Sequence, residues 1–261
     1  MPASLASSRW YSKGTIALGI ETSNPSSVRA AQGAETMLGV AAARCDGVDA
    51  GTGEPSWTLL HSEPLRTENP QHDDLAGCID RCVRAAGLTP RLVNAVCVSI
   101  GPGGFTSVRV AVVTAKMICE ATGAASVGVP SADVVMFAQM DITAEGCTAV
   151  ALASKGDNTF VTIYDRNRST VRAGFLCDAK GLNDIFEKDG VRTLIADQFL
   201  PAAMRERASG LGMSVLPPHY SPLACVHAAS RHAAIDPAQL LPLYPREPEA
   251  VTKWRLLHGT R

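Results

Sequence analysis

A glycine-rich segment offers the residues best suited to holding a phosphate. It reads Gly101-Pro-Gly-Gly-Phe-Thr-Ser-Val-Arg109 and stands between an apolar run and a long helical pattern. Its glycines at 101, 103 and 104 can adopt positive φ and turn backbone N–H groups toward an anion. They equally suit a tight strand-to-helix turn in which two backbones pack closely. Both interpretations stay open from the residues alone.

A second loop, Ile20-Glu21-Thr22-Ser23, ends the first apolar run of the chain. Here an acid and a hydroxyl could meet a phosphate or its metal ion. The pattern is short and not specific by itself. It gains meaning only in combination with the glycine segment.

Other chemistry is absent from the sequence. There is no Gly-x-x-x-x-Gly-Lys phosphate loop, no Gly-x-Ser-x-Gly elbow and no His-Glu-x-x-His zinc motif. The 6 histidines include no pair four residues apart, and the 8 cysteines include no Cys-x-x-Cys pair. Scattered cysteines within apolar runs are typical of reduced, buried thiols. We therefore predict no metal site and no catalytic residue.

The elements that must position the two loops follow from periodicity and punctuation. The first half predicts strands at 15–20, 37–43, 57–61 and 95–100, with helices at 70–86 and 108–121. The first helix has Asn69 as a cap, Pro70 at its first position and Gly87 as its stop. The second helix is apolar nearly all round, so it needs cover on more than one side. A strand is the alternative for 108–121, but residues 116–120 break the alternation.

The second half repeats this coarse order of strands before helices, although no internal repeat is detectable. We expect a helix at 133–140 behind Ser131, strands at 148–153, 160–164 and 171–176, a helix at 182–188, a strand at 192–196 and a helix at 199–209. From residue 217 onward many prolines predict an irregular terminus on the surface.

Composition sets the broad class. The chain has 261 residues, 46% of them hydrophobic, and a net charge of −1. Such a chain buries a core unaided, and two compact halves are expected. With so small a net charge, the chain is not expected to bind nucleic acid by itself. A net charge near zero instead favours association with a protein partner. Residues 1–14 are predicted to form a flexible leader without a signal peptide or membrane span, and a cytoplasmic location is expected.

The two loops, in this order, resemble the TsaB family (also called YeaZ), the non-catalytic relatives of the threonylcarbamoyl transferase TsaD. Family members have Ile-Asp-Thr-Ser, a histidine in the first helix, Gly-Pro-Gly-Ser-Phe-Thr-Gly-[Leu/Val]-Arg, an Ala-Lys further along that helix, and Val-Gly-Val-Ser-Ser. The chain has in their place Ile20 to Ser23, His72, Gly101 to Arg109, Ala115-Lys116 and Val127-Gly-Val-Pro-Ser131. The resemblance covers roughly residues 15 to 176.

The resemblance implies an α/β protein of the ASKHA fold, the architecture of actin and sugar kinases, with two lobes that each have a mixed sheet and flanking helices. The lobes are expected at 15–126 and at 127–261, the latter with a Pro-rich C-terminal tail. TsaD carries its metal on a His-x-x-x-His helix, whereas this chain has His72 and then Ala76. By family, the chain would be an accessory subunit that scaffolds TsaD, with the ATPase TsaE joining, in threonylcarbamoylation of the adenosine next to the tRNA anticodon. The tRNA would be contacted indirectly, through the complex.

Several positions depart from the family pattern. Glu21 replaces an Asp, Ser107 and Ala111 replace glycines, Ala153 replaces another Asp, and the stretch 24–35 is longer. Each puts a side chain or loop where a nucleotide would approach. We therefore expect a degenerate nucleotide loop and no cofactor bound by this chain alone, with ATP or ADP only in complex with TsaD. The degenerate loop comprises Glu21, Thr22, Ser23, Gly101, Gly103, Gly104 and Thr106.

The two helices of the first lobe are predicted to form the partner surface, for TsaD or for a homodimer of the isolated chain. The residues expected there are Leu75, Cys78, Ile79, Cys82, Phe105, Arg109, Val112, Val113 and Lys116. Burial of both helices within the lobe is the other interpretation. The alternative function is an autonomous ATP-dependent small-molecule kinase of the same fold. A kinase needs two acidic positions at the lobe interface, and only Glu21 is visible.

Overall fold

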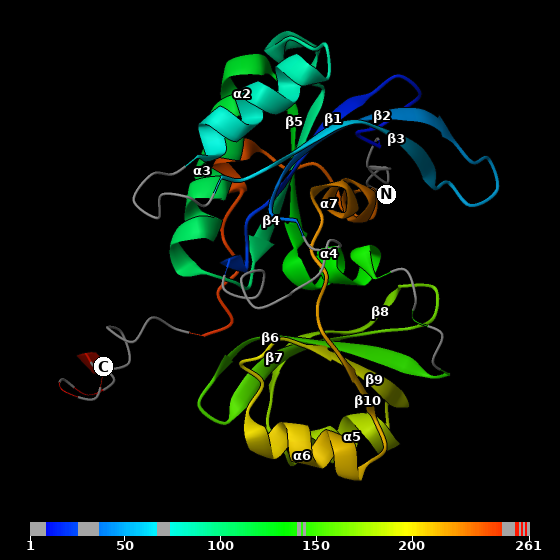
Figure 1. Ribbon diagram of the computed structural model, residues 1–261, viewed down its shortest axis with the longest axis vertical. Coiled ribbons are helices and arrows are strands. Elements are labelled where there is room, and N and C mark those ends of the chain that lie inside the picture. The colour runs from blue at the N-terminus through cyan, green and yellow to red at the C-terminus, as the bar shows by residue number, and fades with distance from the viewer. Residues whose placement is uncertain are drawn as a thin grey trace, which may run out of the picture.

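Two five-stranded sheets lie one above the other, separated by a layer of helices (Figure 1). This computed structural model describes residues 9–25, 37–66, 74–139, 142, 145–246, 254–255, 257 and 259. In the described residues, no helix is long and apolar enough to cross a membrane. The lengthened stretch at 24–35 and the predicted helix start at 70–73, with His72, lie largely or wholly outside them.

The first sheet has the order β3-β2-β1-β4-β5. Its strands are β1 (Ile16–Glu21), β2 (Gly39–Val48), β3 (Pro55–Pro64), β4 (Ala95–Gly101) and β5 (Ala125–Pro130). The first three strands run antiparallel, whereas β1, β4 and β5 run parallel. Because β5 is an edge strand here, this sheet extends past the expected lobe boundary at residue 126.

The second sheet has the same pattern, with the order β10-β9-β6-β7-β8. Its strands are β6 (Cys147–Lys155), β7 (Asn158–Tyr164), β8 (Thr170–Cys177), β9 (Val191–Ala196) and β10 (Ser214–Leu216). Again the first three are antiparallel and the connection to the next two is parallel. The predicted α/β fold with two mixed sheets is confirmed, and the two halves share one topology.

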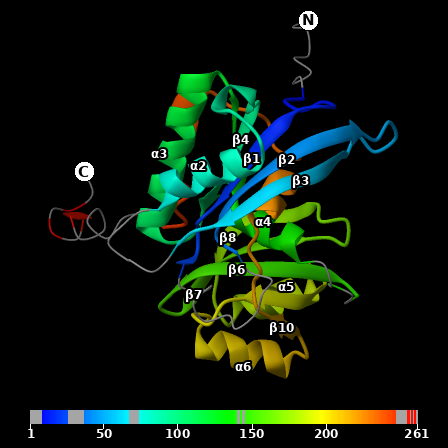
Figure 2. The ribbon, with the colours of Figure 1, turned by 45° about the horizontal axis from the view of Figure 1, so that its top comes forward.

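Helices cover both sheets and fill the space between them. The outer face of the first sheet carries α2 (Leu75–Ala85) and α3 (Phe105–Thr122), which Figure 2 shows side by side, and the 3-10 turn η1 (Pro90–Leu92) precedes β4. The outer face of the second sheet carries α5 (Gly181–Glu187) and α6 (Ala202–Gly210). Between the sheets lie α4 (Ser131–Ala138) and α7 (Pro222–Ala229).

Strand alternation explains this layering. In β1, Leu18 and Ile20 join the core under α2 and α3, whereas Ala17 joins the core under α7. Successive side chains of a strand point to opposite faces, so a sheet with apolar residues at every position requires cover on both sides. The face toward α7 carries the small side chains of Ala17, Ala43, Ala95 and Cys97, which let that helix approach closely.

The expectation of an irregular surface terminus after residue 217 is wrong. Instead α7 is a buried helix on the first sheet, and Leu240, beyond the 3-10 turn η2 (Pro237–Gln239), is 1% exposed in the same lobe. The prolines mislead because Pro222 occupies the first helical position, where its missing N–H costs nothing, and Ser221 caps the helix. At Gly19 an added Cβ would overlap the Pro222 carbonyl, so the helix rests directly on the strand.

The described part of the expected flexible leader is also ordered. Trp10 stacks on Trp57 of β3 at 5.9 Å between ring centroids, and its indole N–H donates to the His232 carbonyl at 3.1 Å. Tyr11 is 8% exposed. For residues 9–14 the prediction of a loose leader is therefore wrong, because aromatic side chains bind them to the sheet and to the end of α7.

Candidate functional site

The two loops singled out in the sequence meet in the structure. Since β1 and β4 are parallel neighbours, their carboxyl ends share one edge of the sheet. Gly104 donates its N–H to the Ser23 carbonyl at 2.6 Å, and the Thr22 hydroxyl donates to the Ser107 carbonyl at 3.1 Å. The loops are thus joined directly by one backbone–backbone and one side chain–backbone hydrogen bond.

The glycines at 103 and 104 are required because the backbone packs closely there, and not because these residues have a positive φ. An added Cβ on Gly103 would overlap the carbonyl group of Ser23. Gly101 has a φ of 101°, but neither Gly103 nor Gly104 has a positive φ. The expectation of left-handed backbone at these two positions is wrong, and the tight-turn interpretation holds. The Gly104 N–H, which an anion would need, is already bonded to Ser23.

Glu21 is turned into the protein at this junction. Its side chain is 0% exposed, and its Oε1 accepts a hydrogen bond from the Ser23 N–H at 2.6 Å. Its Oε2 is buried without a hydrogen-bond partner in the described residues. Desolvation raises the pKa of the Glu21 carboxyl, against the lowering effect of hydrogen bonds from Ser23 and Ser99. Of the seven predicted loop residues, only Thr106 is exposed.

A C-terminal segment at 243–246, which the sequence did not mark, crosses this junction. Leu243 donates its N–H to the Ile100 carbonyl at 2.7 Å, and Tyr244 accepts from Arg109 Nε at 2.6 Å while packing on Phe105. Arg246 then donates to the carbonyls of Ala153 at 2.7 Å and Asn158 at 2.9 Å, in the β6–β7 turn. The segment links the glycine loop to the second sheet, a connection between residues far apart that no local pattern announces.

Comparison with known proteins adds to this geometry. Residues 64–182, which include the glycine loop, match the family model TsaD, tRNA N6-adenosine threonylcarbamoyltransferase. Among curated protein sequences, none matches this chain.

Solved structures resemble the fold across most of the chain. One is an uncharacterized protein from Pseudomonas aeruginosa described as similar to peptidase YEAZ: TM-score 0.59, 16% identity, covering 89% of this chain and 100% of that one. Another is YeaZ from Pseudomonas aeruginosa: TM-score 0.54, 16% identity, covering 88% of this chain and 99% of that one. These two structures confirm the predicted resemblance to YeaZ at the level of the fold.

The nine residues predicted for a partner surface fall into two sets. Leu75, Cys78, Cys82 and Val112 are at most 2% exposed, and Ile79 packs against the same core. They therefore belong to the interior of the first lobe, which is a correction to their predicted role. Four others lie at the surface or partly so: Phe105, Arg109, Val113 and Lys116. The interface itself stays a prediction.

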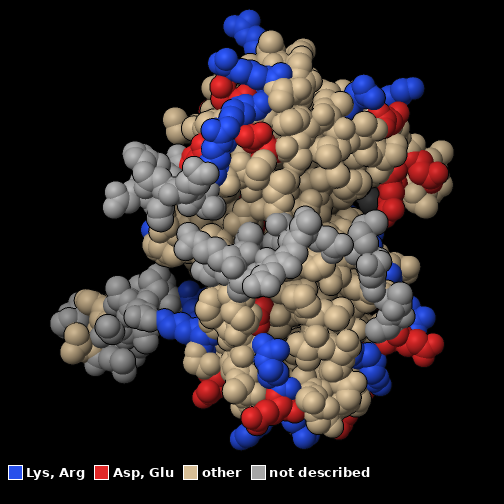
Figure 3. Space-filling view, viewed as in Figure 1, with Lys and Arg blue, Asp and Glu red and all other residues tan. Residues whose placement is uncertain are grey.

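One side of α3 keeps an exposed apolar face. Val113 is 54% exposed and Met117, one turn later, is 68% exposed; sequence reasoning had not singled out Met117. Lys116 donates to the Ala238 carbonyl in η2 at 3.1 Å, so the polar strip of the helix contacts this turn. On the face in Figure 3, Lys and Arg are interspersed with Asp and Glu over both halves.

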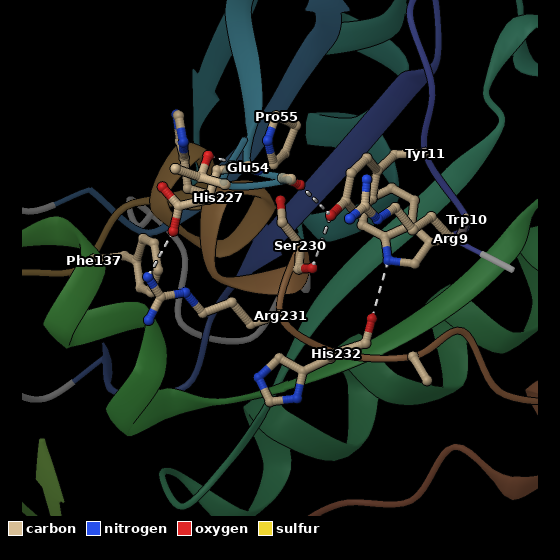
Figure 4. A pocket seen from close by; sticks show the side chains of 13 residues that line it. Arg9, Trp10, Tyr11, Glu54, Pro55, Phe137, His227, Ser230, Arg231 and His232 are labelled. Atoms are coloured by element: carbon tan, nitrogen blue, oxygen red, sulfur yellow. Dashed lines mark hydrogen bonds and ion pairs between the residues drawn. The ribbon is translucent and has the colours of Figure 1, made fainter. Parts of the chain in front are cut away.

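Two adjoining hollows beside α7 form a further candidate site. The smaller, of about 430 Å³, lies between the aromatic residues at 10 and 11 and the C-terminal end of α7 (Figure 4). There Arg231 pairs with Glu54 at 2.9 Å and donates to the Arg168 carbonyl at 2.6 Å. The larger hollow, of about 640 Å³, shares Glu54, Phe137 and His227 with it.

No group of three or more His, Cys, Asp or Glu side chains within the described ranges could hold a metal ion. The 8 cysteines are all free, and 7 of them are buried, as predicted. Burial raises the pKa of their thiols, for example that of Cys82 to about 11. Such thiols stay protonated and behave as core residues.

Proposed function

We propose that this chain is a TsaB-like accessory subunit that scaffolds a TsaD-like catalytic subunit in the cytoplasm. The pair would attach threonylcarbamoyl to N6 of the adenosine next to the tRNA anticodon, with a TsaE-like ATPase joining. The tRNA would be contacted through the complex. This chain would itself carry no catalytic residue and would bind no ATP or ADP outside the complex.

The closed glycine loop is the observation that carries this proposal. A phosphate-binding loop at a helix N-terminus works through free backbone N–H groups. Here Gly104 N–H is bonded to Ser23, and Gly103 lies in backbone contact with the same residue. A nucleotide phosphate would have to separate the two loops before it could bind. A subunit that scaffolds needs no such site.

The exposed face of α3 supports a partner. Interface cores are depleted in charge, and apolar helix faces pack ridge into groove. Phe105, Val113 and Met117 are each more than half exposed on one helix. Because the net charge is only −1, long-range electrostatic repulsion opposes association with a partner very little.

A charge placed on this face tests the proposal. With the chain co-expressed beside a TsaD-like subunit, we expect Val113→Glu to weaken pairing about 100-fold or more, because the interface would bury an unpaired carboxylate. Circular dichroism should show a folded monomer, since Val113 is 54% exposed. The matched control is Val171→Glu in the second sheet, 52% exposed, which should pair normally.

Normal pairing by the Val113→Glu variant would show that α3 is not part of the interface.

An activity assay is a separate test of the proposal. The purified chain alone should transfer no threonylcarbamoyl group and hydrolyse no ATP above background. Turnover that survives purification and disappears in Glu21→Ala would contradict the non-catalytic role.

A further inference from the structure

Gln139, at the end of α4, presents an unsatisfied acceptor beside the larger hollow. The residue is 7% exposed and lines the hollow of about 640 Å³. Its side-chain Oε1 is buried with no hydrogen-bond partner among the described residues. Buried polar atoms in native proteins nearly always have a partner, so an orphaned oxygen at a hollow calls for a donor from outside the chain.

Arg168 brings a positive charge to the same place. It lies in the turn between β7 and β8 with a left-handed φ of 59°. Its Nη2 donates to the Gln139 main-chain carbonyl at 3.4 Å, and its guanidinium lies 5.4 Å from the Phe137 ring centroid. A guanidinium has five N–H donors, and this one uses a single hydrogen bond within the described part of the chain. The others remain for a ligand.

His227 of α7 completes the hollow. Burial lowers the pKa of its imidazole, and the charge of Arg168 lowers it further, which keeps the ring neutral. Other charged or titratable groups face it from neighbouring elements. Glu54, in the turn before β3, is paired with Arg231; His219 precedes α7; and His232 follows α7, paired with Asp133 at 2.7 Å. The unpaired charge in the hollow is thus positive.

We propose that the larger hollow binds a small organic anion that carries a hydrogen-bond donor in addition to its carboxylate or phosphate group. Arg168 would bind the anionic oxygens, since its planar fork suits either group. Gln139 Oε1 would accept from the ligand's N–H or O–H. The site lies beside α7, away from the glycine loop, and does not depend on the proposed scaffolding role.

Proton uptake should accompany binding. An anion held by Arg168 offsets the charge that lowers the His227 pKa, so that pKa rises in the complex. A group whose pKa rises on binding gains a proton, and affinity therefore increases as the pH falls through that range. His227 is the group expected to respond, because its pKa is the one that the charge of Arg168 lowers.

Calorimetry on the full chain tests the site with four probes: AMP, 4-hydroxybenzoate, inorganic phosphate and uncharged adenosine. We expect AMP or 4-hydroxybenzoate to bind with one-to-one stoichiometry, which also distinguishes a phosphate from a carboxylate ligand. Inorganic phosphate should bind more weakly and adenosine not at all. Both Arg168→Met and Gln139→Glu should weaken binding about tenfold or more. Arg172→Met is the control, since Arg172 pairs with Asp189 outside the hollow.

A second measurement does not require a known ligand. By NMR titration, Arg168→Met should raise the His227 pKa in the free chain, because one lowering charge is removed. Saturating AMP or 4-hydroxybenzoate should raise it in the unmodified chain. The proposal is overturned if no probe binds at about 10 mM, or if binding is equal in Arg168→Met and Gln139→Glu variants that melt normally. An unchanged His227 pKa in Arg168→Met would equally contradict the placement of that charge.

Discussion

Gly103 lies where the backbones of two loops touch, so its missing side chain is a structural requirement. In Gly103→Ala the Cβ would overlap the Ser23 carbonyl, and a backbone group yields less readily than a flexible side chain. We expect a loss of about 2–4 kcal/mol in unfolding free energy, measured by denaturant titration. Gly210→Ala is the control, because nothing lies within 4 Å of its added Cβ and its φ is not positive; it should change stability by less than about 1 kcal/mol. Equal stability of the two variants would contradict the close contact.

Glu21 gives the protein a pH dependence opposite to that of its paired carboxylates. Because burial raises its folded pKa, the stabilising contribution of the protonated form is full below the unfolded pKa of about 4.3 and is lost as pH rises through the folded pKa. Glu21→Gln removes the titration but retains an acceptor for the Ser23 N–H.

The difference in unfolding free energy between Glu21→Gln and the unmodified chain should therefore grow in favour of Gln from acid to neutral pH. Acidic groups such as Asp74, whose pKa is lowered mainly by its hydrogen bond with Arg81, act in the opposite direction. They are common to both proteins and cancel in the difference. A difference that is flat with pH would mean that the Glu21 carboxyl is hydrated in the folded chain.

At the scale of elements, α7 is the helix that covers the inner face of the first sheet. Its side chains Cys225, Val226 and Ala228 are 0% exposed, between the first sheet and α4. We expect Val226→Ala to cost about 1–3 kcal/mol, from lost burial and the cavity left behind. Leu241→Ala, in the same C-terminal part of the chain but at a residue 65% exposed, should change stability by less than about 0.5 kcal/mol. If thermal melts show the two variants to be alike, the helix is not part of the core.

The helix α3 illustrates what an element's sequence can and cannot predict. Its apolar circumference must pack against other elements on more than one side, and the structure provides these contacts through the first sheet, Leu240 and η2, which Lys116 contacts. The composition of the helix shows that other elements must pack on it, but it does not show which elements these are. Val113 and Met117 remain exposed because neither layer reaches them.

For the whole molecule, Asp133 links the two halves. It accepts a hydrogen bond from the Tyr164 hydroxyl of β7 and contacts His232 Nε2 at 2.7 Å. Tyr164 is 1% exposed in the core between α4 and the second sheet, and burial raises the pKa of its phenol. A carboxylate with partners in both halves makes their unfolding cooperative.

Asp133→Ala should therefore split or broaden the thermal unfolding transition in calorimetry, because it leaves the buried Tyr164 hydroxyl without its acceptor, at about 1–3 kcal/mol. Asp80→Ala is the control: it breaks an exposed pair with Arg84 within α2 and should keep one transition at nearly the same temperature. One sharp transition in both variants would show that packing alone couples the halves.

The sequence by itself determined most of the elements and their order, but it did not indicate β5, β10 or α7. Side-chain periodicity and the chemistry of Gly and Pro act over a few residues, so strands such as β1 and β4 and the stop of α2 at Gly87 could be predicted locally. The glycine segment also marked its own place between a strand and a helix. Around Pro222 the local pattern was misleading: the prolines predicted an irregular terminus, whereas Pro222 begins the buried helix α7.

Only the tertiary structure decided how those elements meet. The closure of Gly103 on Ser23, the crossing of residues 243–246 and the hollow shared by Gln139, Arg168 and His227 each join residues distant in the chain. The bond from Trp10 to the His232 carbonyl spans 222 positions. Such contacts depend on how faces pack and which polar groups are left to pair, and no local pattern contains that information.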